Sequence, residues 1–238
     1  METTTIKLEA VGDGIWLLTL NRPEVKNALS SVMRREISAV LARLAADGDA
    51  RALVVTGAGT AFCAGFDIGE FGRPELAAEV FESSARYHRD LWRFPKPAIA
   101  AVNGAALGGG FDLAALCDVR LCSPQARFGH PEIKLGGPPL FTALRFIVGD
   151  SRAREMCLTG RRFGADEALH VGIVSEVVSP EELLPRALGI ARQILEAPDA
   201  TLAFTKRTMM ENPGRSFEEA FAVEHDEAFR RFLLREPG

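Results

Sequence analysis

The sequence has little that marks a secreted or membrane-bound protein. Its four cysteines have irregular spacing and no C-x-x-C pair, so we expect reduced, buried thiols rather than a disulfide framework. No run approaches the roughly 18 apolar residues that a membrane span needs. The first ten residues, METTTIKLEA, have neither the apolar core of a signal peptide nor the Arg-rich character of a transit peptide. These absences favour a cytoplasmic protein with no membrane partner.

An excess of basic residues is also missing. The 28 Lys and Arg residues are outnumbered by 32 Asp and Glu residues, which gives a formal net charge of -4. A protein that binds the phosphate backbone normally has a basic excess, so we expect no nucleic-acid partner. There are no repeats, low-complexity tracts or linker-like stretches, and 238 residues suffice for a substantial core. The sequence therefore favours one main domain.

Apolar strands alternate with helical segments through the first two thirds of the chain. Residues 6–8 and 15–20, joined by a Gly-Asp-Gly turn, predict a hairpin, and Ser30 predicts the cap of a helix that ends near Gly48. Further strands are expected at 51–57, 97–104, 119–122 and 173–178, and helices at 74–94, 109–117, much of the chain from 139 onward, and three times within 180–235. This order predicts an α/β fold with a helical C-terminal portion.

The stretch AVNGAALGGGFDLAALCDV (residues 101–119) places Gly108, Gly109 and Gly110 where a strand passes into a helix. Glycine lets backbone approach a ligand closely, and the first N–H groups of a helix lack intrahelical partners and carry partial positive charge. Such a turn could stabilise a developing oxyanion. The alternative is a tight turn packed closely against a neighbouring helix. Asp112 follows in the first helical turn, where the helix dipole alone favours an acid.

Other candidate sites are weaker. In GAGTAFCAGFDI (residues 57–68) the dinucleotide pattern G-x-G-x-x-G fails, because Phe62 stands where the third glycine belongs. Nothing near Cys63 in sequence would lower the pKa of its thiol, which argues against a nucleophile. Glu132 lies in the loop RFGHPEIKLGGPP, where an isolated glutamate is usually solvated. His130 and Glu132 alone are too few ligands to indicate a metal site.

Taken together, these stretches resemble the enoyl-CoA hydratase/isomerase family, the crotonase superfamily. The matching pieces occur in family order over nearly the whole chain: NRPEVKNAL (21–29), AFCAGFDI (61–68), KPAIAAVNGAALGGGFDLAALCDVRL (96–121), ARFGHPEIKLG (126–136) and LTGRRFGADEALHVGIVSEVV (158–178). The resemblance implies an α/β crotonase (ClpP-like) spiral of repeated strand-strand-helix turns over residues 1–179. It also implies a helical C-terminal trimerisation region over residues 180–238, hence a homotrimer or a dimer of trimers.

The resemblance also implies an active site. The oxygen of an acyl-CoA thioester would lie between the backbone N–H groups of Phe66 and Gly109. Family hydratases carry two glutamates that grip one water, at the positions of Asp112 and Glu132 here, so the first acid is one methylene shorter in this chain. Either both acids hold the water, or Glu132 acts largely alone, as in the family's isomerases that move a double bond between carbons.

Hydration of an enoyl-CoA is the favoured activity, because both acidic positions remain acidic. The alternatives are a Δ3–Δ2 double-bond isomerase and, from another class, a non-catalytic acyl-CoA-binding member. Coenzyme A is part of the substrate, and no separate cofactor is expected. The acyl chain is expected between residues 72–90 and 136–146. Coenzyme A contacts are implied for Lys26, Ala28, Leu29, Ala64, Phe66, Asp67, Ile68 and Gly108. The chain ends earlier than most family members, which puts a C-terminal tail contribution to a neighbouring site in doubt.

Overall fold

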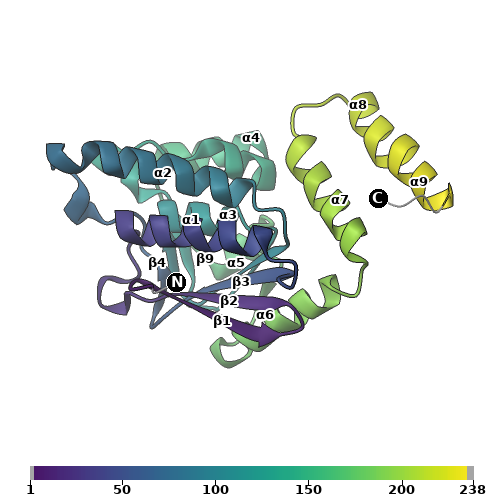
Figure 1. Cartoon of the computed structure of the whole chain (residues 1–238). Helices are drawn as coiled ribbons and strands as arrows, with labels where there is room; N and C mark the ends of the chain where they lie inside the picture. Colours follow the sequence, from purple (N-terminus) through teal and green to yellow (C-terminus); the bar gives the residue numbers. More distant parts are fainter. Residues whose placement is uncertain (1–2, 235–238) are drawn as a thin grey trace.

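Two β-sheets of different size form the frame of the protein (Figure 1) in the computed structural model, which describes residues 3–234. Residues 1–2 and 235–238, the ends of the two expected regions, lie outside the described residues. The larger sheet has the strand order β1 (Ile6–Gly12), β2 (Ile15–Leu20), β3 (Ala52–Gly57), β5 (Ala98–Val102), β7 (Val119–Cys122) and β10 (Glu176–Val177). The smaller sheet has the order β4 (Ala61–Cys63), β6 (Ala105–Leu107), β8 (Arg127–Gly129) and β9 (Phe163–Gly164).

The chain winds as a spiral in which each turn visits both sheets and then forms a helix. The turns are β3, β4 and α2 (Ala77–Trp92), then β5, β6 and α3 (Gly109–Ala115), then β7, β8 and α4 (Phe141–Thr159). Within each sheet the corresponding strands pair in parallel. This order confirms the expected strand-strand-helix repeat. It also stacks the loops that follow β4 and β6, which is where the candidate site is built.

Further helices complete the connections of the spiral. Pro23–Val25, Ile68–Glu70, Pro74–Leu76 and Pro131–Leu135 form 3-10 turns, and α1 (Ser31–Ala46) and α5 (Ala165–His170) are α-helical. Ser30 caps α1 as predicted, its side chain accepting a hydrogen bond from the Met33 amide at 3.2 Å. The predicted hairpin is confirmed as β1 and β2. The strand expected at 173–178 contracts to the two residues of β10.

Both faces of the larger sheet are buried. Leu18, Leu53 and Val55 belong to the main core, to which α1 contributes its apolar face. Ile15, Val54 and other residues of the opposite face pack against α6 (Pro180–Ile194), with its buried residues Leu183, Ala187 and Ala191. Strands covered on both sides appear as continuous apolar runs, which explains ALVV in β3. Helix α6, the first element after the expected division at residue 180, thus packs on this face of the sheet.

The last helices extend away from this body (Figure 1). Helix α7 (Asp199–Glu211) is held by ion pairs of Asp199 with Arg51 and of Lys206 with Asp118. Beyond it come α8 (Phe217–Phe221), a π-helical segment (Ala222–Glu227) and α9 (Ala228–Leu234). None of the helices within residues 3–234 combines the length and apolar character needed to cross a bilayer.

Candidate active site

The loop before α1 and the loop after β4 are joined by backbone hydrogen bonds. The Leu29 amide donates to the Gly65 carbonyl at 2.8 Å, and the Asp67 amide donates to the Leu29 carbonyl at 3.2 Å. These are the two bonds of a parallel bridge between Leu29 and Phe66. Because successive amides of an extended segment point to opposite sides, the Phe66 N–H points away from Leu29. The Phe66 N–H therefore takes no part in the bridge that joins the two loops.

Phe66 and Gly109, the two residues implied as amide donors, lie in contact. A Cβ placed on Gly109 would lie 2.5 Å from the Phe66 ring, closer than any real side chain could approach. Gly109 is the first residue of α3, where an N–H has no intrahelical partner. The structure thus brings both residues together at the meeting point of two loops. That both amides meet at one thioester oxygen stays a prediction.

All three glycines of the run lie against other protein atoms. A Cβ on Gly108 would lie 3.0 Å from Glu132 Oε2, and a Cβ on Gly110 would lie 2.3 Å from the Cys63 carbonyl oxygen. Gly108 also has φ +50°, a conformation that L side chains rarely adopt. Close packing, which the sequence left open as the alternative, therefore favours glycine at positions 109 and 110, and the positive φ favours it at position 108. At Gly108 the consequence concerns the candidate site, because the missing side chain lets the Glu132 carboxylate approach the turn.

An imidazole stands between the two predicted carboxylates. His130 Nδ1 lies 2.8 Å from Glu132 Oε1, and His130 Nε2 lies 3.7 Å from Asp112 Oδ1. Burial raises the pKa of Asp112 above its ordinary value, although His88 and His130 act in the opposite direction. Burial alone would lower the pKa of His130, but the hydrogen bond with Glu132 and the charge of Asp112 raise it above its ordinary value. The two acids are thus linked through one buried side chain.

A second histidine at the site was not expected from the sequence. His88, on α2, places Nε2 3.6 Å from Asp112 Oδ2. Its ring also contacts Phe66, with centroids 6.0 Å apart. The one available signal was helical spacing, because the buried residues Tyr87 and Leu91 place the inner face of α2 beside position 88. Spacing on one helix cannot identify the carboxylate across the fold.

Buried Arg34 was also missed, and it fixes the Phe66 loop. Its Nη1 donates to the Leu29 carbonyl at 2.6 Å, and its Nη2 lies 3.2 Å from Glu70 Oε2. The guanidinium stacks over the Phe66 ring, 4.5 Å from the centroid. Arg34 therefore contacts both partners of the bridge, the Leu29 carbonyl and the Phe66 ring, and holds the two loops together.

The residues implied for coenzyme A contacts differ in accessibility. Lys26 is exposed, and Ile68 is 74% exposed. Leu29 is fully buried, and its backbone N–H and C=O are both bonded within the protein. Asp67 accepts hydrogen bonds from Arg22 and from the Gly69 amide. Ala28, Ala64 and Phe66 are half-buried, whereas Gly108 is buried and donates its amide to the Gly129 carbonyl.

Two features of the structure concern a cysteine nucleophile and a metal site, the other chemistries considered from the sequence. Cys63 is completely buried, which raises the pKa of its thiol to about 12 and keeps it protonated. Residues 3–234 hold no group of three His, Cys, Asp or Glu side chains placed to bind a metal ion.

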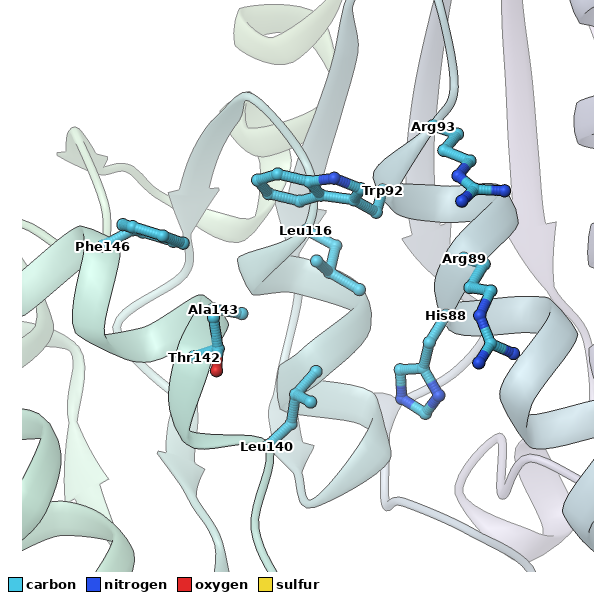
Figure 2. A pocket seen from close by; sticks show the side chains of 9 residues that line it. All are labelled: His88, Arg89, Trp92, Arg93, Leu116, Leu140, Thr142, Ala143 and Phe146. Atoms are coloured by element: carbon cyan, nitrogen blue, oxygen red, sulfur yellow. The ribbon is translucent and has the colours of Figure 1, made fainter. Parts of the chain in front are cut away.

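A cavity of about 240 Å³ lies beside His88 (Figure 2). It lies between α2, the C-terminal end of α3 and the start of α4, and its lining is almost entirely apolar. His88 lines this cavity and also faces Asp112, so the cavity and the acidic pair share a wall. Both segments expected along an acyl chain contribute. The lining residues are His88, Arg89, Trp92, Arg93, Leu116, Leu140, Thr142, Ala143 and Phe146.

Comparisons with known proteins agree on one family. The model of the family described as Enoyl-CoA hydratase/isomerase matches residues 10–232. The short-chain-enoyl-CoA hydratase of Clostridium acetobutylicum is 37% identical over 242 residues, covering 96% of this chain and 89% of that protein. The hydroxycinnamoyl-CoA hydratase-lyase of Pseudomonas fluorescens is 36% identical, with 85% and 76% covered. The crystal structure of an enoyl-CoA hydratase from Mycobacterium smegmatis has a TM-score of 0.90 at 30% identity, covering 98% of this chain and 92% of that one.

Proposed function

Because the chain belongs to the enoyl-CoA hydratase/isomerase family, we propose that it is an enzyme that adds water to the double bond of an enoyl-CoA thioester. The observation that carries this proposal is the acidic pair. Asp112 and Glu132 retain carboxylates at both positions and are connected through His130. A protein that only bound acyl-CoA would have no need of acids at both positions.

The first step is stabilisation of negative charge on the thioester oxygen. Attack of water on the β-carbon pushes electrons into the thioester, and the resulting enolate concentrates charge on its oxygen. The amides of Phe66 and Gly109 are proposed to donate hydrogen bonds to that oxygen. Donors already directed there stabilise the enolate more than the substrate, and this difference accelerates the reaction. Arg34 supports the step by fixing the bridge beside Phe66.

The two carboxyl groups supply the proton transfers. One carboxylate takes a proton from water as its oxygen bonds to the β-carbon, and the other carboxyl group gives a proton to the α-carbon. Glu132 Oε2 is buried and, within the described part of the chain, has no hydrogen-bond partner. That oxygen is therefore the atom that we assign to the proton transfer by Glu132. Asp112 is proposed to act from the opposite side.

Incubation with crotonyl-CoA tests the proposed function. We expect loss of the absorbance of the conjugated thioester, with 3-hydroxyacyl-CoA as product. A gain of that absorbance from a 3-enoyl-CoA, without hydration, would assign the isomerase instead. Binding of acyl-CoA with no turnover at any chain length would support the non-catalytic alternative.

We propose that the coenzyme A portion of the substrate contacts the exposed residues Lys26 and Ile68, which lie beside the Phe66 loop. Coenzyme A enters as part of the substrate, and the proposed chemistry requires no further cofactor. A cytoplasmic location and the absence of a nucleic-acid partner stay predictions. All four cysteines are free and buried, as that location would allow.

The apolar cavity beside His88 is proposed to hold the acyl chain. Ala143→Leu adds three carbon atoms to its wall, so we expect longer enoyl chains to be excluded while crotonyl-CoA is still accepted. Since one methylene in an apolar pocket is worth about 10- to 200-fold, kcat/KM for an eight-carbon substrate should fall at least about 10-fold relative to crotonyl-CoA. Kinetics with a series of chain lengths measures this ratio. An equal change for all chain lengths would contradict the assignment.

The C-terminal helices are proposed to mediate self-association into a homotrimer or a dimer of trimers. Phe217, Phe221, His225, Phe229 and Phe232 form a continuous row of ring contacts along α8 to α9. Phe217 and Phe232 are 78% and 76% exposed. An exposed apolar row of this kind supports the proposal, because such patches are often interaction surfaces.

Phe217→Glu is therefore expected to shift the protein toward the mass of one chain in light scattering coupled to size exclusion. Leu158→Glu, at an equally exposed apolar residue on α4, is the matched control and should keep the wild-type mass. A wild-type protein that is already monomeric, or an unchanged mass in Phe217→Glu, would contradict this role of the row.

A further inference from the structure

Four titratable side chains from three segments of the chain stand in a row. His88 Nε2 lies 3.6 Å from Asp112 Oδ2, Asp112 Oδ1 lies 3.7 Å from His130 Nε2, and His130 Nδ1 lies 2.8 Å from Glu132 Oε1. His88 comes from α2, Asp112 from α3, and His130 and Glu132 from the segment that follows β8. Each oxygen of Asp112 therefore faces the Nε2 atom of a different imidazole.

The hydrogen-bond partners fix which ring nitrogens carry hydrogen. His88 Nδ1 lies 2.9 Å from the Ser84 carbonyl oxygen, which can only accept, so His88 Nδ1 is the donor. His130 Nδ1 faces the Glu132 carboxylate and is a donor on the same grounds. In their neutral forms, both imidazoles then turn the lone pair of Nε2 toward an oxygen of Asp112. This arrangement is favourable only if a proton lies on Asp112 or on one of the two Nε2 atoms.

Groups packed around the row do not compete for that proton. Asp112 is surrounded by His88 and Tyr87 from α2, Cys63 from β4, Cys157 from α4, and His130 with Glu132. Burial raises the pKa of Cys63 to about 12 and that of Cys157 to about 11, and it raises the pKa of Tyr87 well above its ordinary value. These groups stay protonated at neutral pH. The exchangeable proton therefore belongs to the row of histidines and acids.

After each hydration, the carboxyl group that must donate the next proton has lost its proton, and the other carboxyl group carries one instead. The O–H bond of water breaks, its oxygen bonds to the β-carbon, and its proton goes to one carboxylate. The α-carbon takes the proton that the other carboxyl group held. No net proton is gained or lost, but the donor and acceptor acids have exchanged states. Before the next substrate reacts, a proton must return between Glu132 and Asp112.

We propose that His130 returns this proton between Asp112 and Glu132 after each turnover, while His88 holds Asp112 in place from the other side. Both histidines are positioning residues that act through the two acids. With hydrogen on Nδ1, the His130 imidazole accepts a proton from Asp112 at Nε2 and releases its Nδ1 hydrogen to Glu132. Asp112 is then the acid that takes the proton of water, and Glu132 is the acid that protonates the α-carbon. Exchange with water at the partly exposed Glu132 side restores hydrogen to Nδ1 before the next relay. Asp112 has a side chain only 9% exposed, so His130 offers a shorter route than solvent does. The inference rests on the proposed hydration.

The first test reads the protons directly. The chain has four histidines, and nitrogen NMR of the imidazole rings resolves which nitrogen carries hydrogen. We expect His88 and His130 with hydrogen on Nδ1. In Asp112→Asn, the pKa of His130 should fall by about one unit or more, because a nearby opposite charge is lost. His170, exposed on α5, is the internal control and should not move. Hydrogen on Nε2 of His130 alone, or an unmoved His130 titration, would overturn the inference.

The second test separates the first turnover from later ones. His130→Gln keeps an N–H donor toward Glu132 but has no nitrogen that both accepts and releases a proton. With crotonyl-CoA, rapid mixing should show about one product per active site at a rate near that of the wild type, followed by turnover slower on the order of 10²-fold. His170→Gln should show no such burst. First and later turnovers that fall by the same factor indicate a structural role and overturn the inference, as does an unchanged steady rate.

These outcomes also separate the inference from the proposed function. If the wild-type protein hydrates no enoyl-CoA, the proposed function is wrong, and the proposed proton return is wrong with it. A wild type that hydrates crotonyl-CoA, with no burst in His130→Gln or no coupling of His130 to Asp112, overturns the inference alone.

Discussion

Glu132→Gln is expected to lower kcat for crotonyl-CoA hydration on the order of 10²- to 10⁴-fold, the usual contribution of a positioned acid or base. Glutamine matches glutamate in size, and its side-chain oxygen can still accept the hydrogen bond from His130 Nδ1. The variant therefore keeps the packing over Gly108 but cannot exchange a proton during the reaction. KM should change little, because Glu132 is not among the residues implied in coenzyme A binding.

The matched control is Glu155→Gln on α4, which breaks an exposed ion pair with Arg161 remote from the proposed chemistry. It should retain wild-type kcat. Thermal unfolding of both variants, followed by circular dichroism, should give a cooperative transition and so exclude loss of the fold as the cause. Glu132→Gln with wild-type kcat would remove Glu132 from the mechanism.

Gly109→Ala is the second substitution with a large expected effect. The new Cβ would lie 2.5 Å from the Phe66 ring, so either the ring or the first turn of α3 must move. Since both residues are proposed to donate the amides that bind the thioester oxygen, we expect a loss comparable to removing one such donor. That loss is about 10²- to 10³-fold in kcat. Steady-state kinetics on crotonyl-CoA measures it.

Two further variants separate this steric effect from a general disturbance. Gly189→Ala, in α6, adds the same methyl group where nothing lies within 4 Å, and it should leave kcat unchanged. Phe66→Ala keeps the backbone amide and removes the ring. The double variant Phe66→Ala with Gly109→Ala should therefore recover much of the activity that Gly109→Ala loses. A double variant as slow as the single one would show that the ring contact is not the cause.

The architecture was largely predictable from local patterns, except for the smaller sheet. The hairpin, the Ser30 cap and the apolar strand β3 carry their own signals in the sequence. Strands β4, β6 and β8 have three residues each, and β9 has two. Segments this short become strands only because the spiral places successive turns side by side. Tertiary pairing of that kind leaves no periodicity to detect.

The chemistry of the site was predictable only in part, for a related reason. Both acids and both amide-bearing residues could be named because they lie in stretches with recognisable family motifs. Asp112 considered alone suggested a simple helix-dipole effect, whereas the structure buries it between two imidazoles. His88 and Arg34 come from helices whose sequence spacing indicates burial but not the partner. Contacts between helices and remote loops are set by the fold and cannot be derived from either segment alone.

The account depends most on two backbone amides that meet at one oxygen. A crystal structure with a bound, unreactive acyl-CoA tests this directly. We predict that the thioester oxygen accepts hydrogen bonds from the Phe66 and Gly109 amides, with each nitrogen about 2.7–3.1 Å from it. A thioester oxygen directed to solvent, or either amide bonded elsewhere in that complex, would contradict the account.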